Sequence, residues 1–414
     1  MKRVDRILNH DILIEILSRV PAKELMSLKR VCKEWHRVIS SHSLVKAQLG
    51  RTKLVLTGFI FQAKFIWCNE DIKTVNYIYV VEETTKGVSK VSQNVFDFLP
   101  EDVVVLASCR GLVCCRSCFP FGKPFIYVCN PSNREWVKLE WPWSVSHYDR
   151  SMALALAFDF DPSKGFVERF KLVRLRVEEV QVEMDEEGEG EEEEEEEEGE
   201  LCFTFDLYSS EKGSWRKSNE TCQSYCKLVN NEGLYIGGVL HWLNGGRVLT
   251  FDVENELSLL IPAPVPVSEF MAVPEFCIGE SEGRLHYVVV SEQGVHVWCL
   301  EDYYEYNWTI VFCKSLEEIE GTWPQFFMNL KNHVLERVNG PWVNPLAFKD
   351  GVLLMNVCVN LYLFDIKNNK MVQACTNQDL KSQSMVNPIV FAHSLSLVPF
   401  SAAEKGAFVS HGLN

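Results

Sequence analysis

The first 50 residues show the apolar spacing of three short helices. Residues 11 to 20 place large apolar side chains on one helical face: Ile12, Leu13, Ile16, Leu17 and Val20. Asn9 suits the cap of this helix, and Pro21 suits the first turn of a second helix that carries Leu25, Met26 and Leu28. A third helix has an apolar face of Val31, Cys32, Trp35, Val38 and Ile39. So small a unit buries little apolar surface, so we expect it to dock on the rest of the chain or to bind a partner.

From about residue 51 the pattern changes to short runs of β-branched and aromatic residues separated by turn-forming residues. A weak repeat starts at four glycines that each precede an apolar run: Gly111, Gly238, Gly283 and Gly351. Three of these runs are followed by a strand centred on an aromatic residue (Phe251, Trp298 or Phe364), and tryptophans close three polar turns (Trp136, Trp215 and Trp308). This succession is typical of propeller blades. The pattern predicts a mainly antiparallel β-propeller of about six or seven blades, with a β-sandwich as the alternative.

The formal net charge of -16 comes from one local segment. Residues 178 to 200 contain 16 acidic residues and no basic one, and without them the chain has 41 acidic and 41 basic residues. Because dense like charges repel and bury nothing, we expect residues 178–200 to form a disordered insertion between two strands, with bait for basic partners as an open option. The first 50 residues instead have a net charge of +5, which suits an acidic protein partner.

The 15 cysteines are odd in number, and Asp11 and Glu15 interrupt any apolar leader at the start of the chain. We therefore expect reduced thiols and a cytoplasmic or nuclear protein. No apolar run reaches the ~20 residues that a membrane-spanning helix needs, so no membrane partner is expected.

Several motifs suggest chemistry, but their context favours structural roles. Ser281 stands in "GESEG", yet a strand follows where a nucleophile elbow needs a helix, so a hairpin turn is expected. "DFDPSKG" from Asp159 lacks the later residues of a calcium loop and is interpreted as a turn. The cluster of Cys109, Cys114, Cys115 and Cys118 lacks a second ligand pair, so buried thiols are expected. His241 and His286 recur at equivalent repeat positions, where packing or blade hydrogen bonds are expected. No catalytic, cofactor or metal site is predicted.

The segment "ILNHDILIEILSRVPAKELMSLKRVCKEWHRVISS" resembles the F-box, a motif that docks onto Skp1 in SCF ubiquitin ligases. The matching residues are Leu8, Ile16, Leu17, Arg19, Pro21, Leu25, Val31, Cys32, Lys33, Trp35 and Ile39. Asn9 replaces the first proline of the family pattern, which puts the strength of that contact in question. The resemblance implies that six residues lie at or just beneath a Skp1-binding surface: Leu8, Pro21, Leu25, Leu28, Val31 and Trp35.

The remaining chain is similar to the plant F-box-associated, kelch-like domain, through "SCRGLVCC", "NPSNREW", "FDLYSSEKGSW" and "GGVLHWL" in that order. We therefore expect an F-box in residues 1–48, a propeller in 51–400 and a tail in 401–414. The resemblance implies a non-catalytic substrate-recognition subunit of an SCF-type E3 ligase. It would bind a Skp1-like protein directly, cullin indirectly and an unknown target protein, but no nucleic acid. The alternatives are an F-box adaptor outside a ligase, a glycan-binding F-box receptor, and an enzyme built on the propeller.

Overall fold

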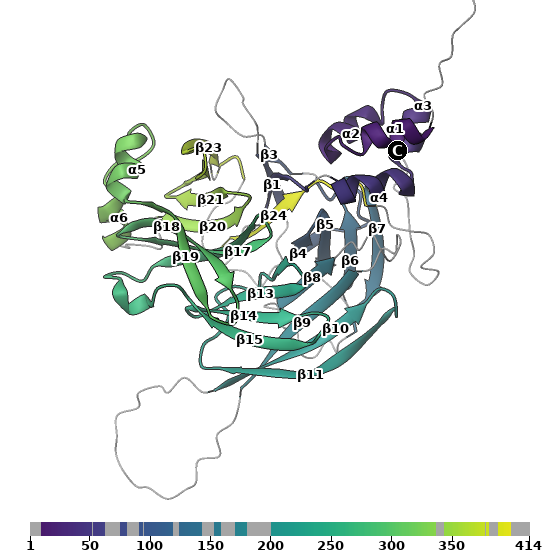
Figure 1. The fold of residues 1–414 in the computed structure, drawn as a ribbon. Helices are drawn as coiled ribbons and strands as arrows, with labels where there is room; N and C mark the ends of the chain where they lie inside the picture. The colour runs from purple at the N-terminus through teal and green to yellow at the C-terminus, as the bar shows by residue number, and fades with distance from the viewer. Residues whose placement is uncertain are drawn as a thin grey trace, which may run out of the picture. The chain divides into compact units, whose positions relative to one another are not determined.

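The computed structural model describes residues 10–51, 53–62, 75–80, 91–93, 95–118, 124–142, 153–158, 170–179, 200–336, 343–376, 378–380 and 388–398 (Figure 1). The chain divides into two units. The first comprises Met1–Val145, Phe158–Phe170 and Val338–Asn414, and the second comprises Ser146–Ala157 and Lys171–Arg337.

The first unit begins with four short helices: α1 (His10–Leu17), α2 (Ala22–Leu28), α3 (Lys33–Ile39) and α4 (His42–Arg51). Three of them were predicted from apolar spacing, with Pro21 as the N-cap residue of α2. The fourth, α4, was not predicted, because its sequence HSLVKAQLGR places few apolar residues at helical spacing. Leu44 and Val45 nevertheless anchor α4 in the apolar core that the four helices share.

The first unit also contains three groups of four antiparallel strands. One sheet has the order β24-β1-β2-β3, with β24 (Ile389–Ser394), β1 (Leu56–Gln62), β2 (Val75–Tyr79) and β3 (Val91–Ser92). A second consists of β4 (Val103–Cys109), β5 (Leu112–Ser117), β6 (Phe125–Asn130) and β7 (Glu135–Glu140). The third consists of β20 (Val343–Lys349), β21 (Val352–Val357), β22 (Asn360–Asp365) and β23 (Lys370–Thr376). In Figure 1 the yellow β24 lies beside β1, so strands from both ends of the chain share one sheet.

The second unit repeats the same four-strand plan. Its strands are β8 (Ala153–Phe158), β9 (Phe170–Glu179), β10 (Leu201–Ser209) and β11 (Ser214–Ser224); β12 (Leu234–Ile236), β13 (Val239–Asn244), β14 (Arg247–Asp252) and β15 (Leu257–Pro262); and β16 (Glu275–Ser281), β17 (Arg284–Ser291), β18 (Gly294–Asp302) and β19 (Asn307–Lys314). A 3-10 turn, η1 (Val267–Glu269), follows β15. Two helices, α5 (Leu316–Thr322) and α6 (Leu330–Glu336), follow β19. The number of blades, predicted as six or seven, stays a prediction.

The repeated glycines mark one kind of turn. In four of the four-strand groups, a two-residue hairpin joins the first and second strands, and its second residue is Gly111, Gly238, Gly283 or Gly351. These glycines have φ values of 87, 99, 77 and 84°, and the residue before each also has a positive φ. Two successive positive φ values define a type I′ turn, which matches the twist of paired strands and favours glycine. The "GESEG" segment is such a hairpin, as predicted, with Ser281 paired to Arg284.

The polar turns that follow strands ending in aspartate also have a structural reason. At the β14–β15 turn, Asp252 Oδ1 accepts hydrogen bonds from the backbone N–H groups of Glu254 and Asn255 at 2.9 and 2.8 Å. Asp302 holds the β18–β19 turn in the same way. A strand that ends in Asp or Asn therefore supplies the acceptor that closes the next turn.

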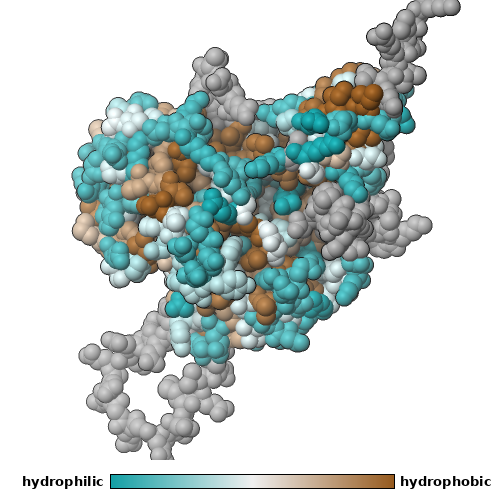
Figure 2. Space-filling view, viewed as in Figure 1, coloured by the Kyte–Doolittle hydropathy of each residue, from teal (hydrophilic) through white to brown (hydrophobic). Residues whose placement is uncertain are grey.

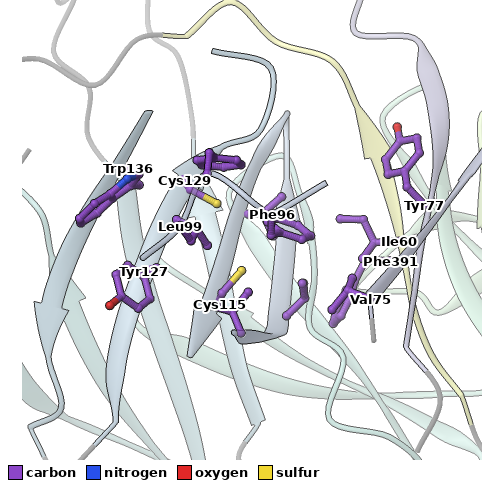
Figure 3. Packing of buried hydrophobic residues seen from close by; sticks show 14 residues of the cluster. Ile60, Val75, Tyr77, Phe96, Leu99, Cys115, Tyr127, Cys129, Trp136 and Phe391 are labelled. Atoms are coloured by element: carbon purple, nitrogen blue, oxygen red, sulfur yellow. The ribbon is translucent and has the colours of Figure 1, made fainter. Parts of the chain in front are cut away.

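A buried cluster of the first unit packs two neighbouring sheets together. Figure 3 shows Tyr127, Cys115 and Trp136 of the β4–β7 sheet on one side, and Ile60 and Phe391 on the other. The rings of Tyr127 and Trp136 meet edge to face, with 5.5 Å between their centroids. Blade-on-blade packing of this kind buries apolar surface without any helix covering the sheet.

Candidate partner-binding surface of the N-terminal helices

The four N-terminal helices share an apolar core. Its fully buried members include Leu25, Val38, Ile39 and Leu44, and Leu13 and Leu17 of α1 complete it. The core explains why such short helices form, because tertiary packing supplies the stability that eight-residue helices lack on their own.

Large apolar side chains remain outside this core. Ile12 and Ile16, one turn apart on α1, are each 51% exposed, and Val31 before α3 is 61% exposed. Figure 2 shows apolar side chains gathered on the visible face of these helices. Ile12, Ile16 and Val31 are called the helical patch below. Exposed apolar groups of this size on a folded unit commonly mark a binding surface.

The six predicted contact residues have different environments. Pro21 and Val31 are exposed, whereas Leu28 and Trp35 are half-buried and pack against the helical core. Leu25 is fully buried, so any contribution it makes to binding is through the shape of the core. Leu8 and Asn9 lie outside the described residues. The role of these residues in binding stays a prediction.

Sequence reasoning missed Ile12 and Ile16 as surface residues, because it placed them on the same face as Leu13 and Leu17. A signal was present: five of the eight residues of α1, HDILIEIL, are isoleucine or leucine. A helix that only covers a core needs a narrower apolar stripe. The excess of apolar residues therefore indicates a second apolar face.

An ion-pair network connects α1 to α4. Glu15 contacts Arg19 and Arg51, with 2.7 Å between the charged atoms in both cases. Arg51 Nη1 also donates a hydrogen bond to Ser18 Oγ at 2.6 Å. The hydrogen bonds from Arg19 and then Arg51 lower the pKa of the Glu15 carboxyl group, so it stays ionised at neutral pH. Because these groups are exposed, the pairs orient the helices more than they stabilise them.

The C-terminal segment joins the helical core. Leu397 is buried in the same cluster as α1–α4, and Leu395 packs against it. The side-chain amide of Asn130 donates to the carbonyl groups of Ser396 and Val398 at 3.0 and 2.7 Å, and Asn133 donates to those of Leu397 and Val398. Residues 395–398 are called the C-terminal strap below. It holds the helices against the β6–β7 turn of the first unit.

The buried histidines and thiols have structural environments. His241 donates a hydrogen bond from Nδ1 to the Leu234 carbonyl group and accepts one at Nε2 from the Tyr303 hydroxyl group, and burial lowers the pKa of its imidazole to about 4. This confirms the predicted blade hydrogen bond. Cys109, Cys114 and Cys115 are buried as predicted, whereas Cys118 is only half-buried, which corrects the prediction for that thiol. Burial raises the pKa of the Cys114 and Cys115 thiols. Within the described ranges, no three His, Cys, Asp or Glu side chains are grouped to hold a metal ion. The turn predicted at "DFDPSKG" lies outside those ranges.

Over the part of the chain that the structure describes, every helix is too short or too polar to cross a bilayer.

Comparison with known proteins gives matches along most of the chain. The profile described as "F-box domain" matches residues 7–46, and the profile described as "F-box protein At3g26010-like, beta-propeller" matches residues 82–334. F-box protein At5g49610 of Arabidopsis thaliana is 27% identical over 330 residues, which cover 77% of this chain and 81% of that protein. F-box/kelch-repeat protein At3g23880 of the same plant is 21% identical over 402 residues, which cover 90% of this chain and 94% of that protein. Among solved structures, TolB from Acinetobacter baumannii is similar to this chain at 11% sequence identity. The match covers 87% of this chain and 72% of TolB, with a TM-score of only 0.37.

Proposed function

Because the chain belongs to the family of F-box proteins with an At3g26010-like β-propeller, we propose that it is the substrate-recognition subunit of an SCF-type E3 ubiquitin ligase. Its F-box binds a Skp1-like protein, which links it to cullin, and its propeller binds the target protein. F-box proteins are typically non-catalytic adaptors. The contribution of this chain is proximity, because holding a target lysine near a charged E2 enzyme raises the effective concentration of the two reactants.

The observation that supports this proposal is the helical patch. Ile12, Ile16 and Val31 stay in solvent although the core beneath them is closed by other side chains. Burying a fully exposed side chain of this size contributes roughly 1.5–3 kcal/mol, and these side chains, which are 51–61% exposed, can gain about half of that. The net charge of +5 over the first 50 residues adds attraction to an acidic partner surface.

Within this proposal, Pro21 and Val31 contact the Skp1-like protein together with Ile12 and Ile16. Leu28 and Trp35 lie at the edge of the contact, since they are half-buried and pack on the helical core. Leu25 supports the surface from beneath, and Leu8 contributes by family resemblance. Complexes of this kind act in the cytoplasm or the nucleus, which is where we expect this protein.

The test is co-purification of the full chain with a tagged Skp1-like protein from Arabidopsis. Ile16→Asp places a carboxylate in the contact, so we expect at least a tenfold loss of retained Skp1-like protein. The matched control is Val359→Asp, because Val359 is exposed to a similar degree (59%) on the β21–β22 turn. Both variants should unfold cooperatively at the temperature of the parent.

If the Ile16→Asp variant retains as much Skp1-like protein as the parent does, the helical patch is not the Skp1-binding surface. Cullin is measured in the same samples. If the Skp1-like protein is retained and cullin is absent, the chain is an F-box adaptor outside a ligase.

A further inference from the structure

The second unit contains a strongly acidic region that the overall charge balance hides. Residues 263–336 contain 12 acidic and 3 basic residues, a net charge of -9. They form η1, the strands β16–β19 and the helices α5 and α6. Outside the glutamate-rich segment the whole chain is balanced, so this region is a local concentration of negative charge rather than an average property. Such a field attracts positively charged partners.

Partly exposed aromatic and apolar side chains gather in this region. Trp298 of β18 pairs with Ile310 of β19, and Leu300 pairs with Trp308, so these side chains share one face of the sheet. Phe270, Trp298 and Trp308 pack against one buried cluster but are not fully covered by it. Ile310 is 48% exposed, and Met271 is largely exposed beside Phe270. Figure 2 shows apolar side chains on the visible face near β18 and β19. The β19 patch is defined as Phe270, Met271, Trp298, Trp308 and Ile310.

The patch is held in place by its neighbours. Trp308 Nε1 donates a hydrogen bond to the Pro262 carbonyl group at 3.0 Å, and its ring meets that of Tyr287 with 5.9 Å between centroids. An indole that is anchored at its polar end loses little conformational entropy on binding, which is typical of residues that dominate interface energies.

Acidic side chains lie beside the patch. Glu269 immediately precedes Phe270, and Glu305 lies in the β18–β19 turn, three residues before Trp308. Glu301 lies in β18, on the face of the sheet opposite Trp308. Glu301 accepts hydrogen bonds from Thr309 and Arg284, whereas Glu269 and Glu305 are exposed. The surface therefore combines an apolar centre with negative flanks.

The edge of the sheet favours recognition by side chains over strand addition. β19 is the last strand of its sheet, but Val297 pairs with Phe312 and Trp298 with Ile310, which leaves Val311 as a β-bulge. A bulge breaks the regular row of backbone donors and acceptors that an added strand would need.

We propose that the β19 patch is the docking site for a basic segment of the target protein, in which lysine or arginine residues flank an apolar anchor. This deepens the proposed function and rests on it. The anchor packs on Trp298, Trp308 and Ile310, and the basic residues approach Glu269 and Glu305. Charge complementarity selects this occupant, because an acidic or uncharged segment would bring either repulsion or no electrostatic attraction to these glutamates.

The experiment measures binding of short fluorescein-labelled peptides to the full chain in complex with a Skp1-like protein, by fluorescence anisotropy. The first peptide has an apolar Leu-Trp-Leu centre with lysine and arginine on both sides. The second has the same centre with glutamate flanks, and the third has the basic flanks around a Gly-Ser-Gly centre. We expect the first peptide to bind at least tenfold more tightly than either of the others.

Variants locate the site. Ile310→Lys places a like charge in the apolar centre and should weaken the first peptide at least tenfold, whereas Val359→Lys, at a comparably exposed valine of the first unit, should have no effect. The Glu269→Lys and Glu305→Lys variants should each weaken binding several-fold at low salt and less at high salt. None of these side chains is buried, so all four variants should melt like the parent.

Three results would overturn the proposal: no binding of the first peptide to the parent, equal binding of the basic and acidic peptides, or unchanged binding by Ile310→Lys. Self-association of the chain that Ile310→Lys abolishes would instead assign the patch to a second copy, and also overturns it. Retention of the Skp1-like protein is scored on the same samples. If the Skp1-like protein is not retained but the first peptide still binds, the ligase proposal is wrong and the docking site stands. If the Skp1-like protein is retained but the first peptide does not bind, only the docking site is wrong.

Discussion

His241 is buried in an environment that favours the neutral imidazole. Its Nδ1 lies 3.1 Å from the Leu234 carbonyl oxygen, which only accepts, so Nδ1 carries the proton and donates. Nε2 then accepts from the hydroxyl of Tyr303 at 2.9 Å. Both nitrogens are satisfied without a second proton. Burial accordingly lowers the pKa of His241 from 6.5 to about 4.

This pKa predicts how stability depends on pH. Below about pH 6.5 the unfolded chain binds a proton at this histidine that the folded chain excludes until about pH 4, so stability falls as the pH falls through this window. Between about pH 7.5 and about pH 5 the loss is about 2 kcal/mol from this residue. Urea unfolding at both pH values measures it. The His241→Gln variant should lose about 2 kcal/mol less than the parent over that interval; an equal loss in both would show that His241 does not carry the effect.

At the same scale, the sequence predicted residue types better than it predicted their environments. Leu25 and Val31 were both predicted to lie at or just beneath one surface, without saying which; Leu25 is fully buried and Val31 is 61% exposed. Helical spacing cannot separate them, because a face that binds a partner is as apolar as a face that covers a core. The separation depends on where α1, α3 and α4 meet, which is tertiary information.

At the scale of elements, the turns explain what was predictable. Glycines in type I′ turns act locally, so their spacing predicted the repeat of short strands. The family matches confirm the class of both parts of the chain. The helices α5 and α6 were missed. A local signal existed for α5, since Ser315 and Glu318 form a capping box at its start. The spacing of the repeated glycines contains no information about this helix.

The hairpin of β9 and β10 gives a prediction for the glutamate-rich segment. β9 ends at Glu179 and β10 begins at Leu201, and these two residues pair across the strands, so the ends of the segment lie on adjacent strands. The disordered insertion was predicted to begin at residue 178, but Glu178 and Glu179 are the last residues of β9 and pair with β10. The rest of the prediction, over residues 180–199, lies outside the described ranges. Deleting residues 183–199 leaves a four-residue turn, and closing a shorter loop should change the free energy of unfolding by less than ~1 kcal/mol. Thermal melting compares parent and deletion; a large loss of folded protein would mean that the segment packs on the strands.

For the whole molecule, the pairing of β24 with β1 has a consequence that chain order does not reveal. The last described strand completes the sheet that contains the first one, and the C-terminal strap continues from it into the core of the helices. The sequence predicted an F-box in residues 1–48 and a propeller in residues 51–400, with a boundary near residue 50. Hydrophobic spacing is local, so it could not show that Leu397 packs with residues nearly the whole chain away.

The position of the C-terminal strap predicts that a substitution of Leu397 changes stability in the full chain but not in a fragment that lacks the helices. In the full chain, Leu397→Ser removes a buried side chain from the helical core and leaves a hydroxyl there, so it should cost roughly 2–5 kcal/mol of the stability of the helical part. In a fragment of residues 53–414, which lacks the helices, Leu397 has lost those packing partners. The same substitution should then cost less than ~0.5 kcal/mol, as for a surface site, and should reduce aggregation because it removes exposed apolar surface. Urea unfolding and light scattering of all four proteins test this, with Leu257→Ser as the control, since Leu257 is exposed in both backgrounds. An equal loss of stability in fragment and full chain would mean that Leu397 packs on the propeller, and that the helices are attached by their chain connection rather than by the strap.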